Sequence, residues 1–225
     1  MEFLELLKTG RPVLLDGGMG TMLQARGLPV GAAPETAALE HPEWLREIHS
    51  AYLDAGSQIV YANTFGANRE KLAHCGRTVA EVVPAAVSVA REAARGRGLV
   101  ALDVGPIGQL LEPTGTLEFE QAVDIFAEVV EAGAAAGADL IAIETMTDLQ
   151  EARAALLAAR EHSSLPVLVT MTYEATGRTF LGCSPACAAL TLEGLGADAI
   201  GVNCSLGPRE MPPLVEELLR WTTLP

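Results

Sequence analysis

Long apolar stretches are missing from this sequence, and so is a basic amino terminus. Hydrophobic residues make up 49% of the 225 residues, but polar or charged groups interrupt every run before it reaches the ~20 apolar residues that a membrane-spanning helix needs. The segment from Met1 to Lys8 contains acid before and among its apolar residues and lacks the cleavage site of a secretory signal. The sequence therefore predicts a cytoplasmic globular protein with no membrane partner.

Basic residues and cysteines are also scarce. Lysine and arginine together number 15 against 29 acidic residues, which gives a net charge of −14. Such a surface repels a phosphate backbone, so nucleic acid is not an expected partner. In a chain without a secretory signal, the four cysteines are expected to be free thiols or metal ligands instead of a disulfide framework.

Short β-branched apolar runs alternate with longer stretches rich in Ala, Glu and Leu. A short, nearly continuous apolar run indicates a strand covered on both faces, and apolar residues spaced three to four apart indicate a helix. The predicted strands are residues 13–16, 58–61, 99–103, 139–144, 166–171 and 198–203. The predicted helices are residues 42–55, 79–95, 117–136, 148–162, 185–195 and 209–221.

Strict alternation of strands and helices predicts parallel strands, in either a doubly wound sheet or a (β/α)8 barrel of the TIM type. Polar residues stand at the carboxyl ends of the predicted strands, at Asp16, Asn63, Asp103, Glu144, Thr172 and Asn203. A doubly wound sheet gathers its site at one switch point, whereas a barrel builds its site from many strand ends. The pattern therefore favours the barrel.

Six strand–helix units are fewer than the eight of a complete barrel, which typically takes ~250 residues. The last residues, 219–225, are expected to end a helix and approach another strand. We therefore expect residues 1–225 to form one incomplete α/β barrel domain, with the last two strand–helix units missing from this chain.

Three strand ends carry groups that suit an amino-acid ligand. Asp16 offers a charge for an amine, and the glycines Gly17 and Gly18 let backbone N–H groups approach a carboxylate, although such glycines also form ordinary tight turns. Asn63 begins a loop dense in amides and hydroxyls, where an Asn is often only a turn former. Glu144 emerges from an apolar run, where a carboxylate needs a partner such as a substrate ammonium.

The last predicted strand ends at Asn203 and Cys204, which places a thiol at the mouth of the expected barrel. A lone cysteine is more often packed or inert than reactive. Cys75, Cys183 and Cys187 fall at the ends of helical stretches and are expected to be structural. The i, i+4 spacing of the last two could bind a metal, but no His or carboxylate joins them locally.

Five segments, in this order, resemble the homocysteine methyltransferase family, and within it the homocysteine-binding domain of cobalamin-dependent methionine synthases. They are Asp16–Thr21, Asn63–Asn68, Gly105–Gly108, Glu144–Asp148 and Asn203–Pro208. Several polar motifs at separate strand ends are much more specific than any one of them. The resemblance implies zinc-dependent transfer of a methyl group to the thiol of homocysteine, which gives methionine.

The resemblance also implies which groups take part. Cys204 would be catalytic as a zinc ligand, with two further cysteines expected beyond Pro225. The donor would be methylcobalamin on another domain, with methyltetrahydrofolate on a further domain of the same protein. This chain alone is therefore expected to be inactive.

For the substrate, the resemblance implies that Asp16 and Glu144 hold the ammonium group of homocysteine. The backbone N–H groups of Gly17 and Gly18 would hold its carboxylate. Asn63 and Asn203 would shape the loops around it.

Three other functions are open. A free-standing homocysteine methyltransferase could use betaine or S-methylmethionine on the same barrel, and a non-catalytic barrel could simply bind an amino acid. A barrel lyase or aldolase is formally possible, but no lysine that could form a Schiff base stands at a strand end. The only lysines are Lys8 and Lys71, and neither follows a predicted strand.

Overall fold

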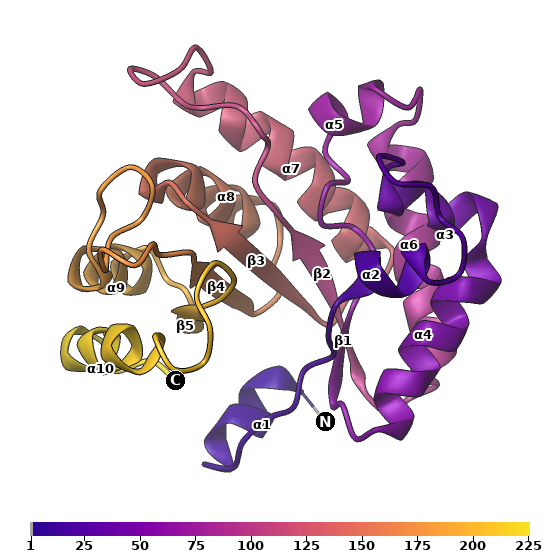
Figure 1. The fold of residues 1–225 in the computed structure, drawn as a ribbon, viewed down its shortest axis with the longest axis horizontal. Coiled ribbons are helices and arrows are strands. Elements are labelled where there is room, and N and C mark those ends of the chain that lie inside the picture. Colours follow the sequence, from indigo (N-terminus) through magenta and orange to yellow (C-terminus); the bar gives the residue numbers. More distant parts are fainter. Residues whose placement is uncertain (1) are drawn as a thin grey trace.

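A five-stranded parallel sheet lies at the centre of the structure, a computed structural model that describes residues 2–225. Its strands are β1 (Ile59–Tyr61), β2 (Leu99–Val104), β3 (Leu140–Met146), β4 (Val167–Met171) and β5 (Ala199–Val202). Each strand pairs with the next one along the chain, in the order β1-β2-β3-β4-β5 (Figure 1). This is the order of a (β/α)8 barrel, whereas a doubly wound sheet reverses direction at a switch point.

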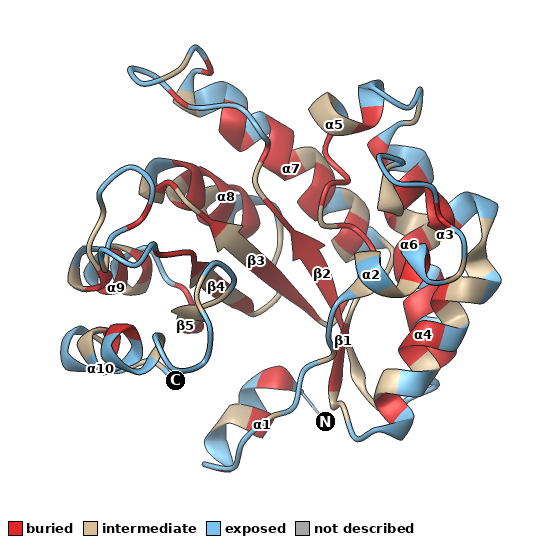
Figure 2. Ribbon diagram, in the orientation of Figure 1, coloured by how far each residue is buried: buried red, intermediate tan, exposed pale blue. Residues whose placement is uncertain are grey.

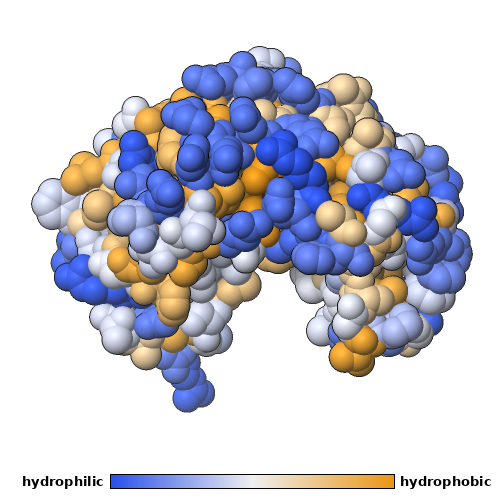
Figure 3. Space-filling model, turned by 90° about the horizontal axis from the view of Figure 1, so that it is seen from above, coloured by the Kyte–Doolittle hydropathy of each residue, from blue (hydrophilic) through white to orange (hydrophobic). Residues whose placement is uncertain are grey.

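Helices cover the outer face of the sheet. The long ones are α4 (Pro42–Asp54), α6 (Val79–Ala94), α7 (Phe119–Ala135), α8 (Leu149–His162), α9 (Pro185–Gly194) and α10 (Pro212–Trp221). Shorter ones are α1 (Phe3–Lys8), α2 (Met19–Gln24), η1 (Pro34–Thr36), α3 (Ala37–Glu40) and α5 (Arg69–Ala73). Figure 3, viewed from above Figure 1, shows an arch around a hollow that is open on one side. The fold is thus part of a TIM-type barrel.

The side-chain alternation of β2 explains how the two faces of the sheet are covered. Val100, Leu102 and Val104 point outward and belong to the large core that the sheet shares with α6, α7 and α8. Ala101 points inward and lies in a smaller cluster with Phe3 of α1. Figure 2 shows β1 and β2 mostly buried, together with the sides of α6, α7 and α8 that face the sheet. Burying a valine, leucine or phenylalanine side chain fully stabilises the fold by roughly 1.5–3 kcal/mol.

The same alternation places particular side chains inside the arch. Residues two apart on a strand face the same side, so Asp103 faces inward like Ala101. Glu144 faces inward like Leu140 and Ala142, which lie in the inner cluster. Helix α1 covers this inner face near the amino ends of the strands, and the polar residues remain near the carboxyl ends.

The six predicted long helices are present to within three residues at either end. The first predicted strand is the exception, because residues 13–16 form only an isolated bridge between Leu15 and Ile59. Side chains take part of the role of a partner strand: the N–H of Leu14 donates to Oε1 of Gln58 at 3.2 Å, and the hydroxyl of Ser57 donates to the carbonyl of Leu15 at 3.1 Å. The sheet therefore has five strands instead of six.

The other sheet edge is β5. The N–H of Ile200 donates to the carbonyl of Pro225 at 3.1 Å, so residues 222–225 return from α10 to the edge of the sheet.

No helix within residues 2–225 is both long and apolar enough to cross a bilayer.

Candidate active site

A cavity of about 530 Å³ opens at the carboxyl ends of the strands. All the residues proposed from the sequence line it: Asp16, Gly17, Gly18, Asn63, Glu144, Asn203 and Cys204. Glu144 lies near the carboxyl end of β3, Asn63 follows β1, Asn203 and Cys204 follow β5, and the other three belong to the segment that precedes α2. Carboxyl ends of parallel strands lie on one face of a barrel, which is why residues so far apart in sequence meet here.

Asp16 is fixed in the cavity wall by the neighbouring strand. Its Oδ2 accepts a hydrogen bond from the N–H of Tyr61 at 2.9 Å. Burial raises the pKa of Asp16 to about 7, and the nearby charge of Glu144 acts in the same direction. The hydrogen bond from Tyr61 opposes this shift, because it favours the charged form.

Gly17 and Gly18 lie where the chain passes the side chain of Tyr52 of α4. The hydroxyl of Tyr52 donates to the carbonyl of Gly18 at 3.1 Å. A Cβ at Gly17 would lie only 3.0 Å from that hydroxyl oxygen. A side chain at position 17 would therefore have to displace Tyr52, and the bond from Tyr52 to Gly18 fixes the backbone beside Asp16.

Asn203 organises the opposite wall. Its Nδ2 donates to Oγ1 of Thr145 at 2.8 Å and to Oε2 of Glu144 at 3.3 Å, and its Oδ1 accepts from the N–H of Thr145 at 3.1 Å. Burial raises the pKa of Glu144. Cys204 is exposed and lies 3.6 Å from Oγ1 of Thr145.

The backbone around the thiol is in a rarely populated conformation. Thr145, Cys204 and Ser205 have φ of 61°, 56° and 57°. Residues other than glycine adopt such angles at a cost of order 1–3 kcal/mol each, and they do so mostly at functional sites. The hydrogen bonds that Asn203 makes to Thr145 hold one of these strained residues in place.

Residues 34–36 close a third side of the cavity. Nδ2 of Asn63 donates to the carbonyl of Pro34 at 2.7 Å, and the N–H of Gly66 donates to Oε1 of Glu35 at 2.7 Å. Asn63 thus anchors this segment.

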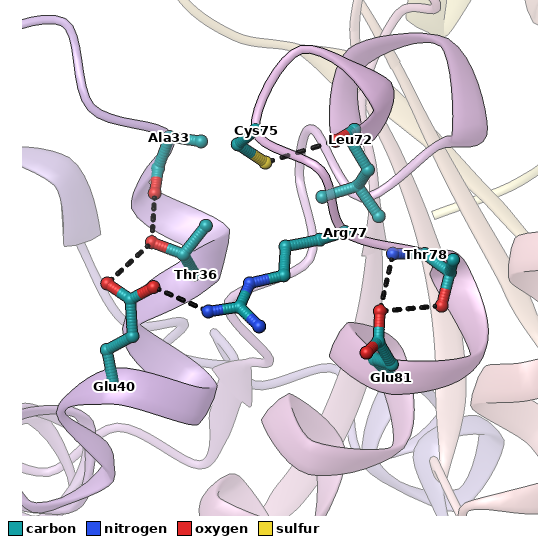
Figure 4. Close-up of polar contacts among 8 residues, drawn as sticks. All are labelled: Ala33, Thr36, Glu40, Leu72, Cys75, Arg77, Thr78 and Glu81. Carbon is teal, nitrogen blue, oxygen red and sulfur yellow. Dashed lines mark hydrogen bonds and ion pairs between the residues drawn. The ribbon is translucent and has the colours of Figure 1, made fainter.

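The same segment is also held from outside. Figure 4 shows Arg77 paired with Glu40 at 2.9 Å, while Glu40 also accepts from the hydroxyl of Thr36 at 3.5 Å. These contacts attach η1 and α3 to the loop before α6. Glu35 therefore keeps its place in the cavity wall through contacts on both sides of the segment.

Comparison with known proteins identifies the family. The sequence profile described as Homocysteine S-methyltransferase matches residues 13–225. The chain belongs to the homocysteine S-methyltransferase family.

Relatives in this family differ in how much of their length the chain spans. The methionine synthase of Mycobacterium tuberculosis is 32% identical over 96% of this chain, which spans 20% of its length. Betaine–homocysteine S-methyltransferase 1 of Sus scrofa is 34% identical over 91% of the chain and 75% of its own length. The metallated form of the Escherichia coli homocysteine methyltransferase MmuM matches with a TM-score of 0.87 and 25% identity, over 99% of this chain and 84% of that one.

Seven of the residues that line this cavity were proposed from the sequence, and others were not. Glu35, Tyr61 and Phe65 also line it. Tyr61 ends a predicted strand, and Phe65 lies in the segment Asn63–Asn68 that carries the family resemblance, so both could have been proposed. Glu35 lies on an unpredicted 3-10 turn, where no periodic pattern marks it. Thr172 supports the cavity from behind by donating to the carbonyl of Asn203 at 3.2 Å.

The metal-binding capacity of the described residues is limited. Cys204 is the only thiol in the cavity wall, since Cys75, Cys183 and Cys187 lie elsewhere. Within residues 2–225, no group of three His, Cys, Asp or Glu side chains is placed to hold a metal ion. One thiolate does not make a zinc site, which uses three or four protein ligands. Zinc bound through Cys204 thus stays a prediction.

Proposed function

We propose that the cavity binds homocysteine and presents its thiol beside Cys204 for methylation, which gives methionine. The observation that carries this proposal is the meeting of Asp16, Glu144 and Cys204 in one cavity. Buried carboxylates need a cationic partner, and an amino acid supplies one in its ammonium group. A cavity of about 530 Å³ lies within the usual ~300–1,000 Å³ of small-molecule sites.

In this proposal each wall of the cavity binds one part of the substrate. Asp16 and Glu144 accept hydrogen bonds from the ammonium group. The backbone N–H groups of Gly17 and Gly18 face the carboxylate. This arrangement directs the thiol end of homocysteine toward Cys204, while Asn203 holds Glu144 and Thr145 in position.

We also propose zinc as the cofactor that activates the substrate thiol, because a free thiol of pKa ~8.5 is mostly protonated at neutral pH. Cys204 would be one ligand. The other ligands would come from outside the described residues, which do not complete a zinc site.

For the methyl donor we propose methylcobalamin, carried with methyltetrahydrofolate on other domains of a larger protein. The order and form of the five segments support this, as does the similarity to methionine synthases of which the chain spans 20%. The second candidate donor is betaine. It is supported by the 34% identity to the betaine-dependent enzyme of Sus scrofa over 75% of that protein.

Donor assays with the full gene product separate these possibilities. The protein is incubated with L-homocysteine and, in separate reactions, methylcobalamin, betaine or S-methylmethionine, and methionine is measured by mass spectrometry. We expect methionine from methylcobalamin alone. Methionine from betaine or S-methylmethionine would replace the proposed donor. Homocysteine binding without product from any donor would indicate a non-catalytic binding protein.

A further inference from the structure

Asp103 on β2 is a carboxylate in the cavity wall to which the proposed function gives no role. It is only 7% exposed, and within residues 2–225 its Oδ1 has no hydrogen-bond partner. Its backbone, in contrast, is well satisfied. The N–H donates to Oγ1 of Thr64 at 3.0 Å, and the carbonyl accepts from the same hydroxyl at 2.8 Å. The unpartnered oxygen is therefore not the result of a loosely held strand.

The surroundings of Asp103 offer no cation to neutralise it. None of the described residues that line the cavity is Lys, Arg or His. Burial raises the pKa of Asp103 well above its usual value, and the nearby charges of Glu144, Asp16, Glu35 and Cys204 act in the same direction. A buried carboxylate among like charges is unfavourable unless a partner arrives from outside the protein. The position thus calls for a ligand with positively charged donors.

We propose that Asp103 binds the substrate directly, as the third acceptor for the primary ammonium group of homocysteine, and so makes the cavity selective for a free amine. This inference rests on the proposed function. It adds a binding residue, and a reason for amine selectivity, that the resemblance does not supply.

The number of donors supports a third acceptor. A primary ammonium group has three N–H donors, as the side chain of lysine does. Asp16 and Glu144 each already accept one hydrogen bond from the protein, from the N–H of Tyr61 and from Nδ2 of Asn203. The carboxyl group of Asp103 lines the cavity and its buried Oδ1 has no such bond, so a rotation of this group can bring an unbonded oxygen to the remaining donor. A trimethylated ammonium has no N–H group and could not satisfy it.

The test compares two ligands that differ only in the amine. Isothermal titration calorimetry is carried out on the full gene product with L-homocysteine and with 4-mercaptobutanoic acid, which keeps the thiol and the carboxylate. The variant is Asp103→Asn, which removes the charge and nearly preserves the shape. The matched control is Glu151→Gln, because Glu151 is a buried acid of α8 that does not line the cavity. Asp103→Ser is the second variant, to be used if the Asp103→Asn protein does not fold.

We expect Asp103→Asn to weaken homocysteine binding at least tenfold, to change binding of 4-mercaptobutanoic acid less than twofold, and to leave the circular dichroism spectrum unchanged. The Glu151→Gln control should change neither affinity. Equal losses of affinity for both ligands would show that Asp103 acts only on the shape of the cavity. Unchanged homocysteine binding would show that Asp103 does not contact the ammonium group. Either result overturns this inference alone. Failure of the unsubstituted protein to bind homocysteine would overturn the proposed function as well.

Discussion

Nδ2 of Asn203 lies 3.3 Å from Oε2 of Glu144, and this hydrogen bond joins residues that are 59 positions apart in the sequence. Glu144 belongs to β3, whereas Asn203 directly follows β5. The contact therefore bridges over β4 at the carboxyl ends of the strands. The hydrogen bond fixes one carboxylate oxygen of Glu144 and thereby sets the direction of the other. The loop after β5 therefore controls how Glu144 contacts a ligand.

Glu144→Gln should weaken homocysteine binding by ~1–3 kcal/mol, because the ammonium group loses a charged acceptor. The oxygen of the new amide can still accept from Asn203, so folding should be preserved. Zinc content should not change. Calorimetry on the full gene product measures the affinity, and an affinity equal to that of the unsubstituted protein would remove Glu144 from the substrate site.

Asn203→Ala should destabilise the loops around the thiol. The N–H of Thr145, which donates to Oδ1 of Asn203 at 3.1 Å, would lose its partner, at a cost of ~1–3 kcal/mol. Urea denaturation measures the loss of stability, and homocysteine affinity should fall at the same time.

The matched control for Asn203 is Asn68→Ala. Asn68 caps α5 by accepting from the N–H of Lys71 at 3.0 Å and does not line the cavity. Its loss should cost ~1 kcal/mol of stability without a change in homocysteine affinity. Equal effects of the two substitutions on affinity would mean that Asn203 has no specific role at the site.

The 225-residue chain as isolated should not retain stoichiometric zinc. Cys204 is the only thiol in the cavity, and no group of three ligands is available within residues 2–225. Elemental analysis after dialysis against a weak chelator should give well below one zinc per chain. Near-stoichiometric zinc that disappears in Cys204→Ser would contradict this expectation, since it would reveal a closed site.

Glu151→Gln should reduce the pH dependence of stability. Burial raises the pKa of Glu151 to about 7, against the opposing effect of a hydrogen bond from the N–H of Ile107 at 2.6 Å. The folded state therefore keeps a proton that the unfolded state releases. Its contribution to stability is full below the unfolded pKa near 4.5 and is lost as pH rises through about 7.

The shift corresponds to a free energy on the order of 3 kcal/mol. Urea denaturation at pH 5 and pH 8 should show a smaller loss of stability in Glu151→Gln than in the unsubstituted chain. Part of the decline should persist, because burial also raises the pKa values of Asp16, Asp103 and Glu144. An identical decline in both proteins would show that Glu151 does not titrate in this range.

The sequence by itself determined the strand and helix order, the barrel type and seven of the residues that line the cavity. Apolar periodicity of two or of three to four residues decides which side of an element is buried. Polar residues at the ends of buried runs then fall on one face of the barrel. That is why Asp16, Asn63, Glu144 and Cys204 could be placed together from local patterns, and why the long helices were correct to within three residues.

The tertiary structure decided the contacts that depend on which distant segments meet. It reduced the first predicted strand to a bridge between Leu15 and Ile59, because its backbone hydrogen bonds to Gln58 and Ile59 involve just Leu14 and Asp16. It brought Glu35 into the cavity wall through the hydrogen bond from Gly66 to Glu35 and the one from Asn63 to the neighbouring Pro34, in regions without a periodic signal. It left Oδ1 of Asp103 without a partner, which no local pattern reveals, since a hydrogen bond depends on the distance and orientation of two groups in space.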